Sequence, residues 1–529
     1  MEAEFGAGAT MVLSVVAIVF FFTFLHLFES FFLKPDRLRS KLRKQGIGGP
    51  SPSFLLGNLS EIKSIRALSS QAKNAEDASA GGGGGSASIA HGWTSNLFPH
   101  LEQWRNRYGP IFVYSSGTIQ ILCITEMETV KEISLSTSLS LGKPAHLSKD
   151  RGPLLGLGIL ASSGPIWVHQ RKIIAPQLYL DKVKGMTSLM VESANSMLRS
   201  WETKVENHGG QAEINVDGDL RALSADIISK ACFGSNYSEG EEIFLKLRAL
   251  QVVMSKGSIG IPGFRYIPTK NNREMWKLEK EIESMILKVA NERTQHSSHE
   301  QDLLQMILEG AKSLGEDNKS MNISRDKFIV DNCKNIYFAG HETTAITASW
   351  CLMLLAAHPD WQARARSEVL QCCDDRPIDA DTVKNMKTLT MVIQETLRLY
   401  PPAVFVTRQA LEDIRFKNIT IPKGMNFHIP IPMLQQDFHL WGPDACSFDP
   451  QRFSNGVLGA CKNPQAYMPF GVGPRVCAGQ HFAMIELKVI VSLVLSRFEF
   501  SLSPSYKHSP AFRLVVEPEN GVILHVRKL

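Results

Sequence analysis

The sequence predicts a mostly α-helical body with small, segregated β-sheets (an α+β fold), preceded by one membrane-spanning helix. Long stretches carry apolar residues at three- and four-residue spacing with few internal breakers, which is typical of amphipathic helices. β-Rich runs gather in a few places instead of alternating with helices, so neither a doubly wound parallel sheet nor a TIM barrel is expected. From Met11 to Phe28 the only polar residues are Ser14, Thr23 and His26.

Composition narrows the class of protein. The chain has 529 residues, of which 44% are hydrophobic and 21% charged, and no Pro/Gly/Ser-rich linker divides it after about residue 95. We therefore expect one large globular domain. The net charge of +5 suits an acidic partner or an anionic membrane surface and is too weak to indicate nucleic-acid binding. The nine cysteines include no C-x-x-C pair, which argues against a disulfide framework or a zinc site.

The N-terminal apolar run is about the minimum length for a helix that crosses a bilayer. A cleaved signal peptide is the alternative, but the run continues into Glu29-Ser-Phe-Phe-Leu33 without small residues at its end. Basic residues follow it, so the positive-inside rule places the body in the cytosol. We expect an anchor over 1–33, a basic and Pro/Gly linker over 34–52, and a body over 53–529. The low-complexity stretch at about 74–92 is predicted to be a flexible surface insertion.

The elements of the body follow from periodicity. A hairpin is predicted around Ser115-Ser-Gly117, near the start of the body. Helices are predicted at 180–204, 218–233, 274–312, 326–357, 360–373, 381–399 and 479–498. Further short strands are predicted at 404–408, 413–429 and 510–527.

The segment Phe470-Gly-Val-Gly-Pro-Arg-Val-Cys-Ala-Gly479 precedes a predicted helix. Gly473 permits a tight turn that lets the backbone approach a flat ring, and Arg475 offers a fork for a carboxylate. Cys477 lies just before the helix N-terminus, where the dipole and free N–H groups favour the thiolate. The alternative is a buried structural cysteine in a loop.

This segment matches F-x-x-G-x-R-x-C-x-G at Phe470, Gly473, Arg475, Cys477 and Gly479, and so resembles the signature of the cytochrome P-450 family. The resemblance covers nearly all of residues 45–529 and implies the cytochrome P-450 fold. It also implies haem b as the cofactor, with the Cys477 thiolate as the axial iron ligand. Such a ligand pushes electron density toward O–O cleavage.

Ala339-Gly-His-Glu-Thr-Thr344 lies inside a long predicted helix and resembles the family's oxygen-activating segment. Gly340 leaves room for a small ligand, the Thr343 hydroxyl can bond a backbone carbonyl or that ligand, and local loosening of the helix would admit a water. Glu342 can feed protons inward from solvent. The alternative for Gly and Thr inside a helix is close packing. His341 is not expected to be a metal ligand.

Glu395-Thr-Leu-Arg398 matches the family's E-x-x-R, and its three-residue spacing puts both charges on one helix face. We expect an ion-paired brace, completed by Arg452, that supports the thiolate loop. An isolated E-x-x-R is more often a solvated pair.

Trp167-Val-His-Gln-Arg171 resembles the W-x-x-x-R of the family's haem-facing helix. Trp167 and Arg171 would lie on one side of that helix, suited to holding a ring propionate. Arg408 similarly resembles a second propionate clamp, and Arg475 a third. Without the resemblance, Arg171 or Arg408 would more often be a surface arginine.

The resemblance implies a monooxygenase that inserts one atom of O₂ into a compact hydrophobic substrate. The chain lacks a G-x-G-x-x-G fingerprint at a strand–helix junction and the length for a fused flavoprotein, so electrons are expected from NADPH through a separate NADPH-cytochrome P-450 reductase. The expected location is the endoplasmic reticulum membrane, with a single pass. Apolar residues at 154–160, near Tyr337 and Phe338, and at 404–406 are expected to line the substrate pocket.

Residues 156–171 and 173–177 resemble a plant group that includes gibberellin oxidases and cytokinin hydroxylases. The whole chain most resembles the gibberellin-oxidising branch, which implies hydroxylation of a gibberellin precursor, with carbon 13 favoured over epoxidation of the exocyclic double bond. The alternatives are a gibberellin-inactivating epoxidase or hydroxylase, a cytokinin hydroxylase and a triterpenoid oxidase. A haem-thiolate isomerase or dehydratase that uses no oxygen is less consistent with the intact Glu342-Thr343 pair. A haem-binding scaffold would need no brace.

Overall fold

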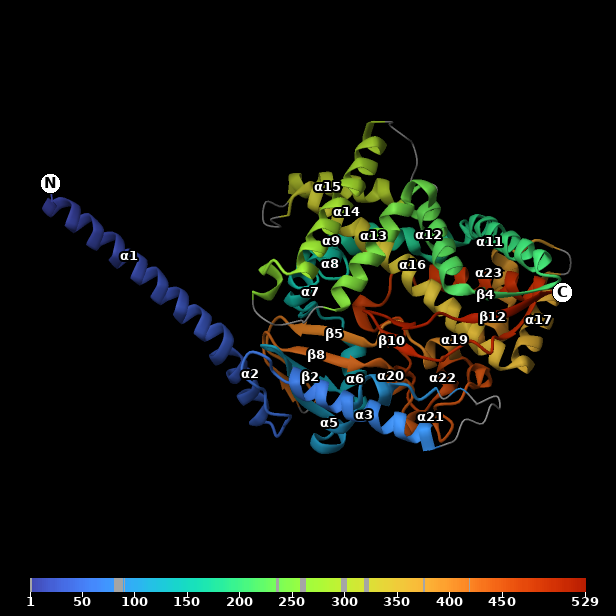
Figure 1. Ribbon diagram of the computed structural model, residues 1–529, viewed down its shortest axis with the longest axis horizontal. Helices are drawn as coiled ribbons and strands as arrows, with labels where there is room; N and C mark the ends of the chain where they lie inside the picture. Colours follow the sequence, from blue (N-terminus) through green and yellow to red (C-terminus); the bar gives the residue numbers. More distant parts are fainter. Residues whose placement is uncertain are drawn as a thin grey trace.

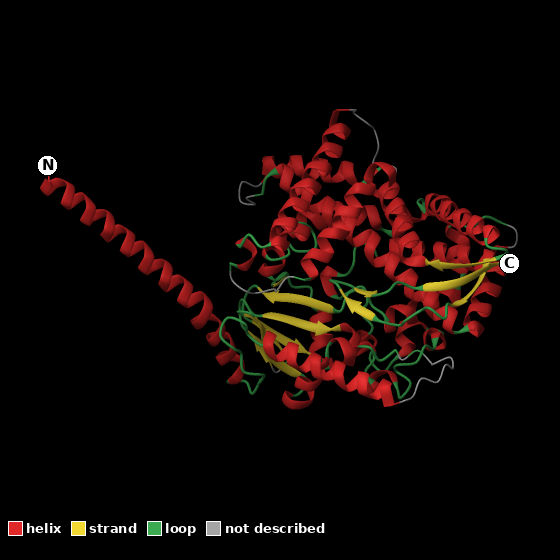
Figure 2. Cartoon of the chain, in the orientation of Figure 1, coloured by secondary structure: helices red, strands yellow, loops and turns green. Residues whose placement is uncertain are grey.

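The computed structural model describes residues 2–79, 89, 91–234, 237–256, 263–295, 302–317, 323–373, 376–417 and 419–529. A helical body carries small sheets along one side, and one long helix projects from it (Figure 1). The predicted class, mostly α with segregated β-sheets, is confirmed (Figure 2). Most of the predicted insertion at about 74–92 lies outside the described residues, apart from its first part, which continues helix α3 (Leu59–Ser79).

The projecting helix is α1 (Glu2–Phe28), which passes through a single π-helical turn (Glu29–Leu33) into α2 (Lys34–Arg43). Residues Leu13–Arg43 form a helix long and apolar enough to cross a membrane, and its most apolar window is not buried against the body. Four rings stack in sequence from this helix to the body: Phe24 on Phe28, Phe28 on Phe32, and Phe32 on Phe54.

Helix α2 packs on the body. Leu42 is fully buried, and Arg39 donates to Ser115 Oγ (2.9 Å), Gln120 Oε1 (3.2 Å) and the Pro50 carbonyl (2.5 Å). Residues 34–52, predicted as a linker, therefore include a helix fixed to the β1–β2 hairpin.

The helices of the body form most of its volume. Those that surround the candidate site are α9 (Gly164–Ile174), α12 (Val216–Phe233), α13 (Tyr237–Ser255), α16 (Arg325–Ala357), α19 (Lys387–Leu399) and α23 (Gln480–Arg497). The outer helices are α5 (Pro99–Tyr108), α6 (Met127–Leu135), α11 (Thr187–Asn207), α14 (Lys270–Gln295), α15 (Leu303–Asp317), α17 (Pro359–Cys373) and α18 (Ala380–Asn385).

The largest sheet has the order β1-β2-β8-β5-β3, and β2 and β8 are its one parallel pair among the described strands. Its strands are β1 (Ile111–Ser116), β2 (Ile119–Ile124), β3 (Leu141–Gly142), β5 (Phe405–Ala410) and β8 (Asn426–Pro430). A second sheet, β4-β12-β9, joins β4 (Gln211–Asn215), β9 (Phe498–Leu502) and β12 (Ile523–Lys528). Two-stranded pairs are β6 (Ile414–Phe416) with β7 (Ile419–Ile421), and β10 (Pro510–Phe512) with β11 (Val516–Pro518).

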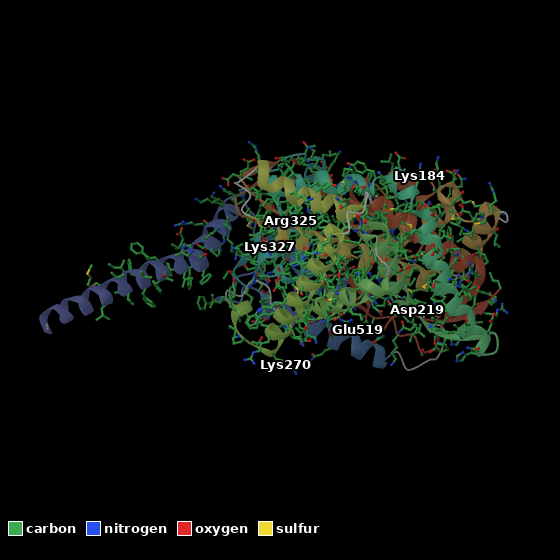
Figure 3. All side chains as sticks on the ribbon, turned by 90° about the horizontal axis from the view of Figure 1, so that it is seen from above. Lys184, Asp219, Lys270, Arg325, Lys327 and Glu519 are labelled. Carbon is green, nitrogen blue, oxygen red and sulfur yellow. The ribbon has the colours of Figure 1, made fainter. Side chains whose placement is uncertain are left out.

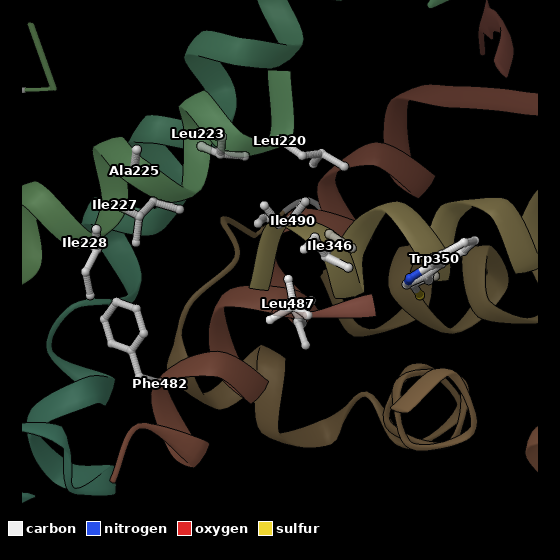
Figure 4. Close-up of a cluster of buried hydrophobic side chains, with 14 of the residues drawn as sticks. Leu220, Leu223, Ala225, Ile227, Ile228, Ile346, Trp350, Phe482, Leu487 and Ile490 are labelled. Atoms are coloured by element: carbon white, nitrogen blue, oxygen red, sulfur yellow. The ribbon is translucent and has the colours of Figure 1, made fainter. Parts of the chain in front are cut away.

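The core that positions the site lies where α12, α16 and α23 meet. Figure 4 shows Leu220 and Ile228 of α12, Ile346 of α16, and Phe482 and Leu487 of α23 converging there. These five side chains are at most 3% exposed. Charged side chains such as Lys184, Lys270 and Glu519 lie at the periphery (Figure 3). The long helix α16 is therefore held by apolar contacts on several sides.

Three predicted ranges each cover more than one helix. The range 180–204 divides into α10 (Leu180–Lys184) and α11, and the range 381–399 divides at Met386 into α18 and α19. The range 274–312 covers α14 and part of α15, and residues 296–301 between them are outside the described part. Helix α9 is the one expected around Trp167 and Arg171, whereas helices α3, α5 and α13 and strands β4 and β9 were not predicted.

Candidate active site

Cys477 lies in the loop between the 3₁₀ turn Gly473–Arg475 and helix α23. Its backbone N–H donates to the Phe470 carbonyl (2.8 Å), which closes the loop. Gly473 has a φ of 69°, as a tight turn requires. A Cβ there would lie 3.3 Å from the Ser136 carbonyl oxygen. The close backbone approach at Gly473 is thus to the segment after α6.

The thiol loop and one face of α16 remain accessible inside the body. No residue from 469 to 480 is fully buried, and Cys477 is exposed. Helix α16 is buried from Phe328 to Ala356 except at Ala339, Gly340 and Thr343, which share one face. The loop that carries Cys477 and the helix that carries Thr343 therefore each present an open strip where a flat cofactor could lie.

Three arginines surround the start of the thiol loop. The Arg171 guanidinium donates to the Val476 carbonyl (2.9 Å), that of Arg408 to the Val472 carbonyl (3.2 Å), and that of Arg475 to the Ser162 carbonyl (3.0 Å). Arg475 also lies over the Trp167 ring, 4.2 Å from its centroid. Sequence reasoning paired Trp167 with Arg171, whereas the ring contact is with Arg475.

This cluster carries excess positive charge. Within the described part of the chain, no carboxylate forms an ion pair with Arg171, Arg408 or Arg475. Burial, with repulsion from Arg408 and Arg171, lowers the pKa of Arg475 to about 9, and burial lowers that of Arg408 to about 10. Burial, together with repulsion from Arg408 and Arg475, also lowers the pKa of Lys143. A group with two carboxylates, such as haem with its propionates, would supply the missing negative charge, so these residues fit that cofactor.

The Cys477 thiol is accessible, but it lies deep inside the body and away from bulk solvent. Burial raises the pKa of Cys477, although the Gly479 backbone N–H and the nearby Arg171 act in the opposite direction. The N–H groups at the start of α23 therefore stabilise the thiolate, as predicted from the sequence. In the protein alone, however, the effect of desolvation on the pKa of Cys477 is larger.

Glu342 does not face solvent. Its carboxylate is fully buried and pairs with Arg248 Nη1 (2.7 Å), Arg221 Nε (3.2 Å) and His341 Nε2 (3.3 Å). Burial acts to raise the pKa of Glu342, but the positive charges of Arg221 and Arg248 help to lower it below its ordinary value. The same two arginines also bind Glu517 of β11, at 3.0 and 2.7 Å. A proton path from solvent through Glu342 must therefore pass this ion cluster.

The oxygen-activating segment lies in an unbroken stretch of α16. The Thr343 hydroxyl donates to the Ala339 carbonyl (2.8 Å), the first of the two options predicted for it. The expected loosening of the helix is not seen among the described residues. A Cβ on Gly340 would lie 2.6 Å from Ile228 Cδ1, so this glycine permits close packing of α12 on α16 instead of making room for a ligand.

Glu395 and Arg398 form a fully buried ion pair, with Nε–Oε2 at 2.6 Å and Nη2–Oε1 at 2.8 Å. Arg452 Nε lies 3.6 Å from Glu395 Oε1. Arg398 also donates to the carbonyls of Gln435, Ala445 and Ser447. The three predicted brace residues therefore meet, and they fix the chain that precedes the thiol loop.

Several polar groups at the site were not predicted. Arg221, Arg248 and Glu517 escaped notice because they come from three distant parts of the chain and form no local motif. Glu486, one turn into α23 beyond the thiol loop, is fully buried, accepts from Ser224 Oγ (2.6 Å), and has its pKa raised by burial to about 8. Its place on the helix that follows the Cys477 loop was a usable signal.

Comparison with known proteins is decisive at the family level. The family model "Cytochrome P450" matches residues 88–526. The chain is 54% identical over 510 residues to Cytochrome P450 714C2 of Oryza sativa subsp. japonica, covering 96% of each chain. It is 45% identical over 533 residues to Cytochrome P450 714B3 of Zea mays (100% and 98% covered) and 45% identical over 510 residues to Cytochrome P450 714A2 of Arabidopsis thaliana (95% of each).

Proposed function

The chain belongs to the cytochrome P450 family and is a haem-thiolate monooxygenase, and from that premise we propose that it hydroxylates a gibberellin precursor, with carbon 13 as the favoured position. Members of this family use haem b and electrons from NADPH delivered by a reductase. The proposal for the substrate is supported by the resemblance of the whole chain to the gibberellin-oxidising branch. Residues 156–171 and 173–177 resemble the wider plant group, which includes gibberellin oxidases and cytokinin hydroxylases.

We assign the axial sulfur to Cys477. The observation that carries this assignment is the exposed thiol in an interior loop beside three arginines that lack carboxylate partners. Arg171, Arg408 and Arg475 would bind the two propionates, and Trp167 would hold the Arg475 guanidinium in place. Phe470, Gly473 and Gly479 would shape the loop. When bound, the haem activates O₂ and inserts one oxygen atom into a C–H bond.

Thr343 and Glu342 would manage the proton supply. The Thr343 hydroxyl lies on the open face of α16 and can exchange its bond to the Ala339 carbonyl for one to a water. Glu342 is held away from solvent by Arg221 and Arg248, so its carboxylate must leave at least one of them before it transfers a proton. The ion cluster would thereby couple proton delivery to movement of α12 or α13.

Glu395, Arg398 and Arg452 would act as the brace of the thiol loop. Arg398 binds three backbone carbonyls while Glu395 accepts from the Asp449 N–H (2.9 Å), so the pair ties α19 to residues 435–449. Loss of one partner would leave a buried charge unpaired, which is strongly destabilising.

The anchor boundary and the cellular location remain those proposed from the sequence, whereas α2, within the proposed linker, packs on the body. Residues 1–33 would anchor the protein in the endoplasmic reticulum membrane, with residues 53–529 in the cytosol, where they can meet the reductase. The basic residues after the apolar run, among them Lys34 and Arg37, are where the positive-inside rule requires them.

The substrate proposal is tested with microsomes that contain this chain and a reductase, NADPH and O₂. A panel of gibberellin precursors, cytokinins and triterpenes is supplied, and products are identified by mass spectrometry and by comparison with 13-hydroxylated and epoxidised standards. We expect a 13-hydroxylated gibberellin. Turnover of a cytokinin or triterpene without turnover of any gibberellin would contradict the proposal.

A further inference from the structure

The loop at 155–160, which is expected to line the substrate pocket, is bound to α16 through its backbone. The N–H groups of Leu157, Ile159 and Leu160 donate to side-chain oxygens of α16. The acceptors are Asp331 Oδ2 (2.8 Å), Asn332 Oδ1 (3.1 Å) and Asn335 Oδ1 (2.9 Å), respectively, and Asn335 Nδ2 donates in return to the Leu155 carbonyl (2.9 Å). We call Asp331, Asn332 and Asn335 the loop clamp.

The clamp is buried and its loop has no spare room. Asp331, Asn332 and Asn335 are at most 1% exposed, and Lys334 Nζ neutralises Asp331 at 3.0 Å while donating to the Pro153 carbonyl (3.1 Å). A Cβ on Gly158 would lie 2.5 Å from Asn335 Oδ1. Glycine at this position therefore allows the loop backbone to lie directly on α16.

The other side of the loop is tied to α9 and to the candidate haem site. Gln170 is fully buried, and its Nε2 donates to the Leu157 carbonyl (2.7 Å) while its Oε1 accepts from Ser162 Oγ (2.5 Å). The Ser162 carbonyl accepts from Arg475. Bonds on both sides, from α16 and from α9, give the loop one position.

The clamp lies on the helix face that leads to the open strip. Asp331, Asn335 and Ala339 follow at four-residue spacing, so they form one line along α16. The clamped loop is thus placed one turn from the accessible residues Ala339 and Gly340. Leu155, Ile159 and Leu160 are apolar and only partly buried, which leaves them free to contact a ligand beside that strip.

We propose that the loop clamp is a specificity-determining device, which keeps residues 155–160 as a fixed apolar wall so that a rigid, compact polycyclic molecule is preferred over a flexible chain. A preformed wall binds a rigid molecule without an ordering cost, whereas a flexible molecule must lose conformational freedom to match it. Asp331, Asn332 and Asn335 are positioning residues in this account. The inference rests on the proposed function, because it takes from it that substrate binds next to residues 155–160.

Two changes test the clamp. Asn335→Leu removes the acceptor for Leu160 and the donor for Leu155, whereas Asn335→Asp keeps the acceptor. Gly158→Ala pushes the loop away from α16, because the added methyl would lie 2.5 Å from both Asn335 Oδ1 and the Asp331 carbonyl oxygen. The φ of Gly158 is not in the left-handed region, so the methyl acts through these collisions. Arg325→Gln is the matched control, since Arg325 is an exposed cation in the first turn of the same helix and none of the clamp contacts given above involves it.

The first measurement is hydrogen exchange by mass spectrometry on the haem-loaded protein. We expect the peptide that covers 153–162 to exchange about tenfold faster in Asn335→Leu and Gly158→Ala, as loss of buried hydrogen bonds implies, with a smaller change in Asn335→Asp and none in Arg325→Gln. The reduced carbon monoxide spectrum should be unchanged in all four variants. Unchanged exchange in both Asn335→Leu and Gly158→Ala would overturn the clamp.

The second measurement is binding, followed by the spin-state change of the ferric haem on titration with a tetracyclic diterpenoid acid and, separately, with palmitic acid. We expect the wild type to prefer the diterpenoid, and the ratio of the two dissociation constants to fall about tenfold in Asn335→Leu. Faster exchange with an unchanged ratio would overturn the role in specificity. A wild type that prefers palmitic acid would contradict both the rigid-substrate preference and the gibberellin proposal, while a preference for a different polycyclic molecule would contradict only the latter.

Discussion

At the scale of single residues, the candidate site depends on one sulfur atom and on three guanidinium groups that have no carboxylate partner among the described residues. Cys477 and the arginines Arg171, Arg408 and Arg475 come from three elements that meet only in the folded chain. The roles assigned to them can therefore be separated by substitution.

Cys477→Ala should abolish the Soret band that a thiolate-ligated haem shows in the reduced carbon monoxide spectrum, because no other described cysteine shares its loop. The measurement is that difference spectrum together with the haem content of the purified protein. Cys461→Ala, which alters another partly exposed thiol, is the control and should leave the band intact. An unchanged band in Cys477→Ala would refute the assignment.

Glu486 predicts a dependence of stability on pH. Because burial raises its folded-state pKa to about 8, the folded protein holds a proton that the unfolded chain releases above its ordinary pKa of 4.5. The unfolding free energy should therefore fall as pH rises from about 4.5 to 8, by no more than about 5 kcal/mol, and level off above that. Glu486→Gln, which is neutral throughout, should remove this fall.

The check is the thermal midpoint of wild type and Glu486→Gln at several pH values across that range. The advantage of the variant over wild type should grow with pH. A constant difference between the two proteins would mean that Glu486 does not titrate with a raised pKa.

At the scale of elements, helix α2 shows that the segment after the anchor is part of the body. Its buried Arg39 makes three hydrogen bonds to the β1–β2 hairpin and the chain before it. Arg39→Met should lower the unfolding free energy by about 2 kcal/mol, since the bonded groups would be left buried without a partner.

The matched control is Arg37→Met, because Arg37 lies on the same helix, is 66% exposed and makes only a long contact to Glu29. The unfolding free energies of both variants are measured by denaturant unfolding, and the rates of proteolysis between residues 43 and 53 are compared. Equal behaviour of the two variants would show that α2 is not needed by the body.

The elements also show which features could be predicted from sequence. Helix α16 and the loop before α23 were located because the apolar spacing of one and the glycine and cysteine spacing of the other are local properties of the chain. The split at Met386 was missed because apolar residues keep their spacing across it. Strand β4 was missed because its partner β12 lies some three hundred residues away and the pairing depends on tertiary contact.

The candidate site divides in the same way. The brace was predicted because Glu395 and Arg398 lie three residues apart, and the structure brings both to Arg452. The ion cluster around Glu342 was not predicted, because Arg221, Arg248 and Glu517 belong to other elements that meet it only in the folded chain. Close packing at Gly340 could not be distinguished from ligand space without the position of Ile228.

At the scale of the whole molecule, an apolar helix projects from a body that carries charged residues such as Lys184 and Lys270 at its periphery (Figures 1 and 3). Deletion of residues 1–33 should move the protein from the carbonate-washed membrane pellet to the supernatant while leaving the carbon monoxide spectrum unchanged. Deletion of 1–52 should also destabilise the body, because it removes Arg39 and Leu42. Equal thermal midpoints for the two truncated proteins would contradict this boundary.

The stacked rings of Phe24, Phe28, Phe32 and Phe54 leave little slack between the apolar helix and the body. A helix that tilts to fit a thinner or thicker bilayer would act as a lever on the enzyme attached to it. Lipid composition would then set how the body is oriented over the membrane, and with it how easily a hydrophobic substrate dissolved in that membrane reaches the enzyme.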